Sequence, residues 1–393
     1  MNRWEFVDKE IAKAGEDTKP SLTYLQDVWR RFRSNIMAMI GLVMITIIVA
    51  LAIFAPMFSK FSYSQQQLSL GNVPPRLQIV KLSEDLYVFV HSEYKLIEVT
   101  ASGEVLGSPK PVKKDTQAKQ TTYNFNGTEV ILDYGKAADK ELVSGELKYD
   151  LLVNGKQVST KPYKTVSNKT NPLGTDKLGR DVWVRVLYGA RISLLVGVVA
   201  AVVNAVVGII YGGISGYAGR KVDNLMMRFV DLLNSIPLMI IVVLIMVMTN
   251  KSGVGTIIFT IGLVYWVGMA RQVRGQVMAL KEQEFVLAAK ALGAKPGRII
   301  FRHLIPNALG PIIVTMMMSI PSAIFTESFL SFVGLGVSAP MASWGTLAND
   351  ALGGIRTFPY LLIAPSVAIA LTIFAFNFVG DGLRDALDPK QRK

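Results

Sequence analysis

Apolar and polar positions divide this chain into long uncharged runs and shorter charged connections. Six stretches of 19 or more residues contain no Asp, Glu, Lys or Arg. They span residues 36–58, 192–211, 232–250, 252–270, 307–326 and 357–380. Because about 20 apolar residues cover the hydrocarbon core of a bilayer as one helix, the pattern predicts six transmembrane helices. The alternative, a set of buried helices in a large soluble protein, is disfavoured because the charges are confined to the gaps.

A different pattern fills the segment between the first two runs. Residues 88–107 and 147–161 alternate apolar and polar side chains with a period of two, which is typical of β-strands. Within the second stretch, Asn154-Gly155 is the kind of dipeptide that forms a tight hairpin turn. We therefore predict that the insertion 59–170 is a small β-rich domain, with its strands in roughly residues 60–165.

The charged stretch 284–307, EFVLAAKALGAKPGRIIFRHLIPN, has the pattern of a helix, a turn and a second helix. Four apolar positions share one face of the first helix: Phe285, Ala288, Ala289 and Leu292. Gly293 follows as a stop that tolerates a left-handed backbone, and Pro296 stands near the next helix start. A small-residue face beside a rigid turn predicts a docking surface for another protein.

The distribution of positive charge predicts the orientation of the spans. Four segments together hold 21 Lys and Arg residues. They are the tail 1–35, the connections 212–229 and 271–307, and the end of the chain after residue 380, which includes the tail 389–393. The two short loops on the opposite side hold only Lys251 and Arg356. Because short cytoplasmic segments are enriched in Lys and Arg, we expect both termini and residues 271–307 to face the cytoplasm. The long insertion is exempt from this bias and is expected outside.

Composition excludes several other classes of protein. The net charge of +13 reflects membrane topology and not a nucleic-acid surface, because we find no aromatic stacking or groove-reading elements. The chain contains no cysteine, which excludes disulfides, thiolate zinc sites and cysteine nucleophiles. His91 and His303 are isolated from each other and from metal-ligand patterns. There is no GxxxxGK[ST] phosphate loop and no GxSxG elbow, so any ATP that drives this protein is hydrolysed by another subunit.

The first span is expected to stay in the membrane as an anchor, because its run of 23 apolar residues is too long for a cleaved signal peptide. Apolar residues recur at helical spacing in the tail just before it: Leu22, Leu25, Trp29 and Phe32. With Arg30, Arg31 and Arg33 among them, they predict a helix on the inner membrane surface. A basic flank that only fixes orientation is the alternative.

Several motifs, in order, resemble one protein family. They are NPLGTDKLGRDVWVRVLYGARISL, GYAGRKVDNLMMRFVDLLNSIP, RQVRGQVMALKEQEFVLAAKALGAKPGRIIFRHLIPN, ESFLSFVGLGVSAPMASWGTL and GDGLRDALDPK. They look like the second permease subunit of dipeptide and oligopeptide ABC importers. The similarity covers approximately residues 28–59 and 171–388. The insertion is longer than the first exported loop of that family.

The resemblance implies an all-α polytopic membrane protein with six transmembrane helices of the type I ABC importer kind, and a β-rich extracellular insertion between helices 1 and 2. Residues 171–388 would form a five-helix permease core in the bacterial plasma membrane. The implied partners are a paralogous permease subunit in a heterodimer, two cytoplasmic ATPase subunits, an extracellular substrate-binding protein, a peptide substrate and the lipid bilayer. This chain would bind no cofactor, no metal and no nucleic acid, and ATP-Mg would be held by the partner subunits.

Residues 284–307 resemble the EAA loop, the cytoplasmic coupling element that sits in a groove on the ATPase subunit. The resemblance assigns this coupling to seven residues: Glu284, Phe285, Ala288, Ala289, Leu292, Gly293 and Pro306. Three positions depart from the general pattern. Leu287 stands directly before Ala288, at a position where the general pattern commonly has Glu. The nearest acidic residue in this chain is Glu284. His303 and Ile305 stand where the general pattern favours Ile and Leu.

Four charged residues are candidates for a pore or its outer mouth: Glu327, Asp176, Arg180 and Asp181. An acid near membrane depth is a functional candidate, so Glu327 could meet a peptide amino terminus, pair with a neighbouring subunit, or serve as a structural hydrogen-bonded group. The other three precede the second span and would belong to an exported element. Asp231 is expected either to brace the cytoplasmic end near Arg228 or to be solvated.

Two rows of small residues in the second span predict close helix contacts: Gly208, Gly212 and Gly216, and Ser193, Gly197, Ala201 and Ala205. They fit static packing or moving helices. Other readings also stay open at this point. The cargo could be nickel chelates, glutathione or another small solute, and the chain could be a membrane receptor or channel without energy coupling. The insertion could contact a delivering receptor, shield the outer mouth or be a structural elaboration.

Overall fold

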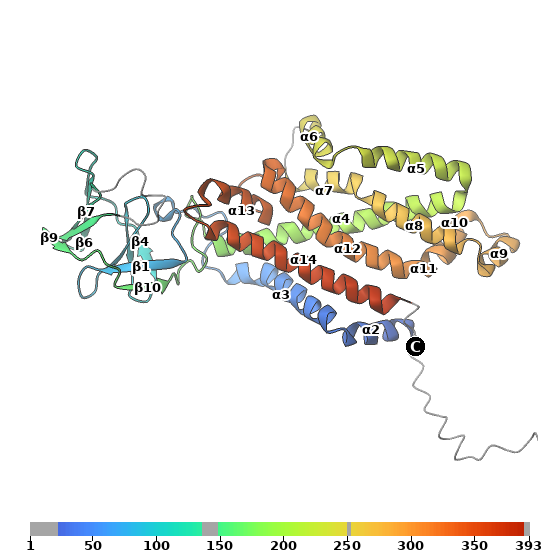
Figure 1. Ribbon diagram of the computed structural model, residues 1–393, viewed down its shortest axis with the longest axis horizontal. Coiled ribbons are helices and arrows are strands. Elements are labelled where there is room, and N and C mark those ends of the chain that lie inside the picture. Colours follow the sequence, from blue (N-terminus) through green and yellow to red (C-terminus); the bar gives the residue numbers. More distant parts are fainter. Residues whose placement is uncertain (1–22, 136–147, 250–252, 389–393) are drawn as a thin grey trace, which may run out of the picture.

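The computed structural model describes residues 23–135, 148–249 and 253–388. It is an elongated molecule in which a β-rich domain extends from one end of a helical bundle (Figure 1). Helices α9 (Glu284–Ala291) and α10 (Pro296–Ile299) lie at the other end, together with α2 (Tyr24–Ser34). The predicted β insertion and the predicted docking segment therefore occupy opposite ends of the bundle.

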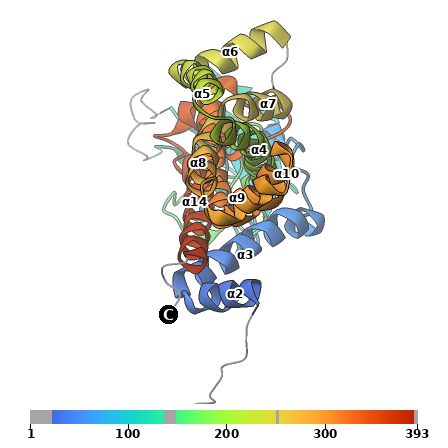
Figure 2. The same ribbon diagram turned by 90° about the vertical axis from the view of Figure 1, so that its right-hand side faces the viewer.

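The bundle is built from long apolar helices joined by short connections. The long elements are α3 (Ile36–Phe58), α4 (Val182–Ala218), α5 (Arg220–Ser235), α6 (Leu238–Thr249), α7 (Val254–Val264), α8 (Trp266–Leu280), α12 (Leu309–Leu330) and α14 (Tyr360–Leu387). The short ones are η3 (Ile300–Leu304), α11 (Ile305–Asn307), η4 (Ser331–Leu335), α13 (Trp344–Ala351) and η5 (Leu352–Gly354), while η1 (Leu68–Leu70) lies in the insertion. In both views α5 and α6 lie along one side of the bundle and α3 along another (Figure 2).

The apolar runs match the helices, with one correction. Among the described residues, five helices are long and apolar enough to cross a membrane, or six if α5 and α6 count as one broken span. The prediction of one continuous helix over 232–250 is wrong, because this range includes the end of α5 and all of α6, which meet at a bend of 84°. Pro237 explains the break, since a residue before proline avoids the helical backbone, and Ile236 is extended with φ −88° and ψ 123°.

A proline inside the first span is compensated by a neighbouring helix. Pro56 lies within α3 and has no N–H, so the carbonyl oxygen of Ala52 loses its helical donor. Arg191 of α4 supplies the replacement, because its Nε donates to Ala52 O at 2.5 Å and its Nη2 donates to Ile53 O at 2.8 Å. A freed carbonyl in a membrane helix needs such a partner, and this contact joins α3 to α4.

Helix α4 is the centre of the bundle. Its 37 residues extend roughly 55 Å at 1.5 Å per residue, which exceeds the thickness of a bilayer core. The predicted glycine row faces α8: a Cβ on Gly208 would lie 2.5 Å from Cβ of Met269, and one on Gly212 would overlap the carbonyl oxygen of Ala270. The absence of side chains on this row lets the two backbones touch.

The second small-residue row of α4 faces α12. A Cβ on Gly197 would lie 2.5 Å from Cγ1 of Ile324, and Ser193 donates a hydrogen bond to Glu327 at 2.8 Å. Ala201 is fully buried in the same contact region. The two rows therefore hold α4 between α8 and α12.

The helix predicted before the first span is present as α2. Leu25 and Trp29 are exposed, whereas Phe32 is buried against Ala38, Val379 and Ala386. Asp27 forms ion pairs with Arg30 and Arg31, each at 2.9 Å, on the polar side of the helix. Leu22 lies outside the described residues. The exposed apolar pair on an otherwise charged helix agrees with a position at a membrane surface.

The insertion folds as two five-stranded antiparallel sheets. The first has the order β10-β1-β2-β3-β4 and the second β5-β6-β7-β8-β9. The strands are β1 (Arg76–Lys81), β2 (Tyr87–Val90), β3 (Leu96–Val99), β4 (Val105–Gly107), β5 (Lys113–Asp115), β6 (Gln120–Phe125), β7 (Thr128–Asp133), β8 (Asp150–Val153), β9 (Lys156–Val158) and β10 (Lys164–Ser167). The predicted turn is confirmed, because Asn154 and Gly155 both have positive φ between the paired residues Val153 and Lys156.

Alternation along the strands gives the first sheet two buried faces. Val88 and Val90 of β2 pack with Tyr123 and Phe125 of the second sheet, while Phe89 between them packs on the opposite face with Leu77 of β1. β1 and β10 pair antiparallel from Arg76 to Ser167, so the domain begins and ends at adjacent backbones. The insertion is therefore a self-contained unit at one end of the bundle.

We predict that Gly212→Ala destabilises the bundle. The new methyl group would overlap the backbone of α8, and overpacking of this kind costs about 1–3 kcal/mol. The thermal unfolding midpoint of the purified chain in detergent should fall. Gly275→Ala on α8 is the matched control, because nothing lies within 4 Å of its Cβ position. Equal midpoints for the two variants would contradict the close α4–α8 contact.

Candidate functional site

The segment from α9 to α11 forms a compact cap on the end of the bundle opposite the β-rich domain (Figure 1). The predicted connection 271–307 is only partly a loop, because α8 continues to Leu280 before the chain turns into α9. Glu284 is the first residue of α9 and is exposed, so its charge lies at the positive end of that helix. Pro306 is exposed near the start of α11.

The turn between α9 and α10 is built as predicted. Gly293 has φ +78°, a left-handed backbone that favours glycine. The N–H of Gly293 donates to the carbonyl oxygen of Lys290 at 2.9 Å, and the N–H of Ala294 donates to that of Ala289 at 3.0 Å. These two bonds form the Schellman ending of a helix, which satisfies its last carbonyls. Pro296 then begins α10 at a position where its missing N–H costs nothing.

The structure corrects the predicted apolar face. Phe285, Ala288 and Leu292 are exposed, and Leu292 is 87% exposed. Ala289 is only 8% exposed and points into the bundle beside Val286, which is completely buried. The four residues therefore do not form one outer surface, because 3.6 residues per turn places Ala289 on the inner side with Val286. The outward apolar surface consists of Phe285, Ala288 and Leu292, with Leu287 next to it at 51% exposed.

The inner side of the cap packs against three long helices. Val286, Ile299 and Leu304 are at most 1% exposed. They belong to one apolar cluster with Val273 and Val277 of α8, Ala205 of α4 and Ile312 of α12. The π-helical turn η3 contributes Ile300, which lies 3.1 Å from the Cβ position of Gly213 on α4. The cap is therefore in direct side-chain contact with α4, α8 and α12.

Two ion pairs join α5 to α8. Arg274 donates to both oxygens of Asp223, at 2.5 and 2.6 Å, and Ser215 of α4 donates to the same carboxylate at 2.6 Å. Asp231 pairs with Arg271 at 2.8 Å. The predicted neighbour of Asp231 was Arg228, which lies on the same helix and is not its partner in the structure. The Asp223–Arg274 pair was missed, because the two residues lie 51 positions apart among several other charged residues.

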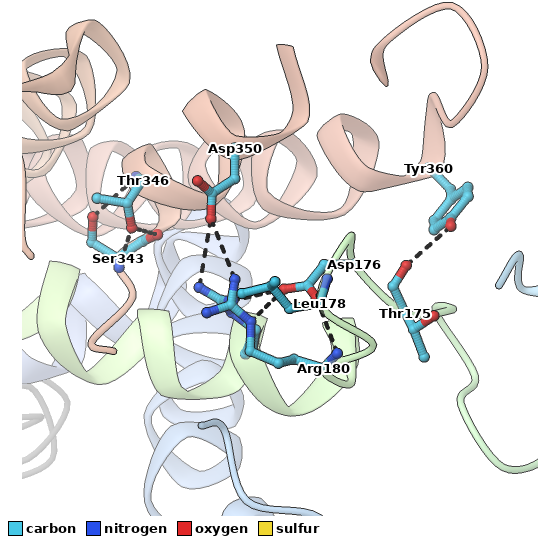
Figure 3. Close-up of polar contacts among 9 residues, drawn as sticks. Thr175, Asp176, Leu178, Arg180, Ser343, Thr346, Asp350 and Tyr360 are labelled. Atoms are coloured by element: carbon cyan, nitrogen blue, oxygen red, sulfur yellow. Dashed lines mark hydrogen bonds and ion pairs between the residues drawn. The ribbon is translucent and has the colours of Figure 1, made fainter. Parts of the chain in front are cut away.

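At the opposite end, the candidates Asp176 and Arg180 form a buried network (Figure 3). Asp176 Oδ1 accepts hydrogen bonds from the N–H groups of Leu178 and Arg180, at 2.9 and 3.0 Å, which shapes the turn that carries both residues. Asp176 Oδ2 accepts from Arg180 Nε and from Arg185 Nη1, both at 2.7 Å. One carboxylate thus holds two guanidinium groups.

Asp181 has a different role from its neighbours. Its Oδ1 accepts the N–H of Val184 at 2.8 Å and caps the start of α4, while its Oδ2 accepts from Asn171 at 2.7 Å. Burial raises the pKa of the Asp181 carboxyl above its usual range, and the two hydrogen bonds offset that rise in part. Asp181 therefore fixes the start of the long helix and does not join the Asp176 network.

Glu327 is completely buried near the C-terminal end of α12. Its carboxylate accepts hydrogen bonds from Ser193 of α4 at 2.8 Å and from Ser331 at 2.7 Å. Ser343 extends the network by donating to Ser331 at 3.3 Å. Of the three roles considered for Glu327, the hydrogen-bonded structural one fits this geometry, because no surface of the side chain is open to a ligand.

Sequence reasoning missed Arg185 and Asp350. Arg185 lies one turn into α4 and is 2% exposed, and its Nη2 lies 3.7 Å from Asp350 Oδ2. Asp350 lies on α13, whose start is capped by Ser343 through the N–H of Thr346. Burial raises the pKa of the Asp350 carboxyl, and the positive charges of Lys177 and Arg180 oppose the rise. The only sequence signal for Arg185 was a charge within the apolar run VWVRVL.

The histidines have ordinary surroundings. His91 is 1% exposed, its Nδ1 accepts the N–H of Glu93 at 3.1 Å, and its Nε2 faces the carbonyl oxygen of Asn72 at 3.1 Å. Burial lowers the pKa of His91, which favours the neutral ring. Within the described ranges, no group of three or more His, Cys, Asp or Glu side chains is arranged to hold a metal ion.

Known proteins resemble this chain over its whole length. The family model described as binding-protein-dependent transport system inner membrane component matches residues 193–393. The model for the N-terminal TM domain of oligopeptide transport permease C matches residues 23–75. The oligopeptide transport system permease protein OppC of Bacillus subtilis (strain 168) is 39% identical and covers 100% of this chain and 98% of its own length.

Two other relatives and one solved structure are also similar. The dipeptide transport system permease protein DppC of Bacillus subtilis (strain 168) is 37% identical over 100% of this chain and 94% of its own length. OppC of Haemophilus influenzae is 49% identical over 56% of this chain and 70% of its own length. The inward-facing MetNI methionine ABC transporter covers 52% of this chain and 96% of its own, at 19% identity and a TM-score of 0.45.

We predict that Ala289→Asp destabilises the cap, whereas Ala288→Asp leaves it folded. The first variant would place a carboxylate in the apolar cluster beside Val286, and an unpaired buried charge is strongly unfavourable. The second would place the same charge in solvent. Limited proteolysis between α8 and α12 should be faster for Ala289→Asp only. Equal protection of both variants would show that Ala289 is not an inner residue.

Proposed function

The chain belongs to the family of binding-protein-dependent transport system inner membrane components, and we propose that it is the permease subunit of an ATP-driven importer of oligopeptides or dipeptides. The observation that carries this proposal is the cap from α9 to α11. It presents an exposed apolar surface on one side and is packed against the long helices on the other. This is the arrangement that a coupling element needs.

The protein is a multi-pass cell membrane protein with a helical permease fold and a β-rich insertion. We infer six spans, with the broken pair α5 and α6 counted as one. The Lys and Arg bias puts the cap, α2 and the end of α14 on the cytoplasmic side. The opposite position of the insertion at the other end of the bundle supports an extracellular domain (Figure 1).

ATP is bound and hydrolysed by partner subunits in this proposal. Phe285, Ala288 and Leu292 dock in a groove on a cytoplasmic ATPase, while Glu284, Gly293 and Pro306 shape the ends of the docking segment. Ala289 contributes from within, by joining α9 to the bundle. The complete importer contains a paralogous permease in a heterodimer, two ATPase subunits with ATP-Mg, and an extracellular binding protein that delivers the peptide.

Transport proceeds by alternating access. Closure of the two ATPases on ATP shifts the caps, and the shared apolar cluster passes the shift to α4, α8 and α12. A ligand changes a conformational equilibrium only by its different affinity for the two states, so ATP acts by favouring the arrangement in which both caps are drawn together. The ion pair between Asp223 and Arg274 joins α5 to α8, so the two helices move together.

We predict that Leu292→Asp uncouples the importer. The residue is 87% exposed in this chain and would be buried at the ATPase contact, so a carboxylate there would be desolvated without a partner. ATP-driven peptide uptake into proteoliposomes should fall by about tenfold or more, the effect of about 1.4 kcal/mol or more at the contact. The ATPase subunits should also co-purify less with the permease.

The matched control for this variant is Leu292→Ala, which adds no charge. It removes apolar contact area only, and its uptake should lie between that of the wild type and that of Leu292→Asp. Thermal stability of the isolated permease should be the same for both Leu292 variants, because the side chain contacts little of its own chain. Normal uptake by Leu292→Asp would remove the basis for placing the ATPase at this cap.

We infer that the β-rich domain contacts the extracellular binding protein. A groove of about 1060 Å³ lies where the domain meets the start of α14, lined from the domain side by Arg76 and His91 and from the helix side by Tyr360. Tyr360 donates to the carbonyl oxygens of Val73 and Thr175, at 3.2 and 3.1 Å, which attaches the domain base to the bundle. A partner seated there would be held beside the outer ends of the spans.

Removal of the domain tests this role. Arg76 and Ser167 face each other across β1 and β10, so residues 77–166 can be replaced by an Asn-Gly turn. We expect membrane insertion and co-purification with the ATPases to persist, while affinity for the binding protein falls by about tenfold. Unchanged affinity and unchanged peptide uptake would leave the domain as a structural elaboration.

A further inference from the structure

Two cavities meet at the outer end of α4. Their volumes are about 440 and 290 Å³, and both lie between the first turn of α4 and helix α13. Five side chains line both of them: Lys177, Arg180, Arg185, Asn349 and Asp350. Three of these five carry a positive charge and one carries a negative charge, while Asp176 adds a second negative charge to the wall of the larger cavity. Positive charges still outnumber negative ones, so the lining favours an anion.

The two arginines of this wall are buried but only partly satisfied. Arg180 is 4% and Arg185 is 2% exposed. Each guanidinium group donates one hydrogen bond to Asp176, at 2.7 Å. Arg185 Nε has no hydrogen-bond partner among the residues that the structure describes. A buried guanidinium nitrogen without a partner is costly, and Arg185 Nε is such a nitrogen. The side chains of Arg180 and Arg185 line both cavities, so a ligand in either cavity would meet these two arginines.

Asp350 contacts the same guanidinium groups only loosely. Its Oδ2 lies 3.7 Å from Arg180 Nη2 and 3.7 Å from Arg185 Nη2. Charge-assisted bonds between arginine and a carboxylate are about 2.7–2.9 Å long, so Asp350 is in electrostatic reach without forming them. Its side chain is 39% exposed, unlike those of the two arginines. The carboxylate of Asp350 is therefore partly open to solvent and makes no short hydrogen bond to either arginine (Figure 3).

We propose that Arg180 and Arg185 form a carboxylate-binding subsite at the outer end of the permease, which receives the C-terminal carboxylate of a peptide as it enters. Asp350 is the internal carboxylate that competes for this subsite and swings out when the peptide arrives. This inference rests on the proposed import of peptides. It means that the permease itself recognises the peptide carboxylate, in addition to recognition of the peptide by the delivering protein.

The geometry suits a terminal carboxylate because arginine presents paired donors to two oxygens in one plane. A cavity of about 440 Å³ lies within the range of small-ligand sites, roughly 300–1000 Å³, and takes the end of a peptide rather than a folded domain. Asp176 remains fixed by four hydrogen bonds and neutralises one of the two guanidinium charges. The second charge is left for the incoming carboxylate.

Equilibrium binding to the purified complex of permeases and ATPases in lipid nanodiscs, without the binding protein, tests the subsite. The probes are a fluorescent tripeptide and the same tripeptide with a C-terminal amide. The wild-type complex should bind the free acid about tenfold more tightly, since hydrogen bonds to charged groups contribute on this scale. Asp350→Asn should strengthen binding of the acid several-fold, because the competing charge is lost, and leave the amide unchanged.

Asp85→Asn is the matched control, because it removes one exposed negative charge in the turn between β1 and β2, away from both cavities. It should leave both probes unaffected. Arg185→Lys should abolish the preference for the acid while keeping the positive charge, and thermal stability measured beside it shows whether the complex is folded. Equal binding of acid and amide to the wild type, or equal effects of Asp350→Asn on both, would overturn the subsite.

Peptide uptake by the whole importer separates this inference from the function on which it rests. If the reconstituted importer takes up peptides but its membrane complex does not distinguish acid from amide, only the subsite is wrong. If neither uptake nor binding of any peptide is seen, the import of peptides is wrong. If Asp350→Asn changes affinity for the binding protein and not for the tripeptide, the arginines serve an acidic segment of that protein, and the subsite is also overturned.

Discussion

The contact between α4 and α8 is the constraint on which the rest of the bundle depends. It exists because Gly208 and Gly212 have no side chains, so two backbones meet where lipid offers no hydrophobic force to drive helices together. The contact fixes the position of α8 relative to α4. α8 in turn carries Arg274, which pairs with α5, and Val273 and Val277, which pack against the cap. The site at one end of the bundle is thus positioned by the packing of α4 against α8.

Much of this fold was accessible from the sequence, because uncharged runs and two-residue alternation report burial directly. The bounds of α3, the Asn154-Gly155 turn and the left-handed Gly293 all followed from local rules. The bend at Pro237 did not follow from local rules, because hydrophobicity predicts that a segment is buried but not the angle between two successive helices. The inward position of Ala289 did not follow from them either. The sequence pattern predicts one apolar face on α9, whereas its apolar residues occupy both a buried and an exposed face.

The candidate sites were predicted unevenly for a similar physical reason. The docking segment is continuous, so its residues could be named from one stretch of sequence. The outer network joins Asp176, Arg185 and Asp350 from segments far apart in the chain, and nothing local indicates that they meet. Glu327 was recognised as unusual, but its partners Ser193 and Ser331 are common residues in membrane helices and gave no signal.

The length of α4 has a mechanical consequence. The helix begins beside the Asp176 network and ends next to Tyr217, over whose ring Lys290 of the cap lies at 5.6 Å from the centroid. An unbroken helix of 37 residues is roughly 55 Å long, so a tilt of about 5° about one end would displace the other end by roughly 5 Å. A small rotation of α4 at the end that contacts the cap would therefore displace the end that holds the Asp176 network by roughly 5 Å.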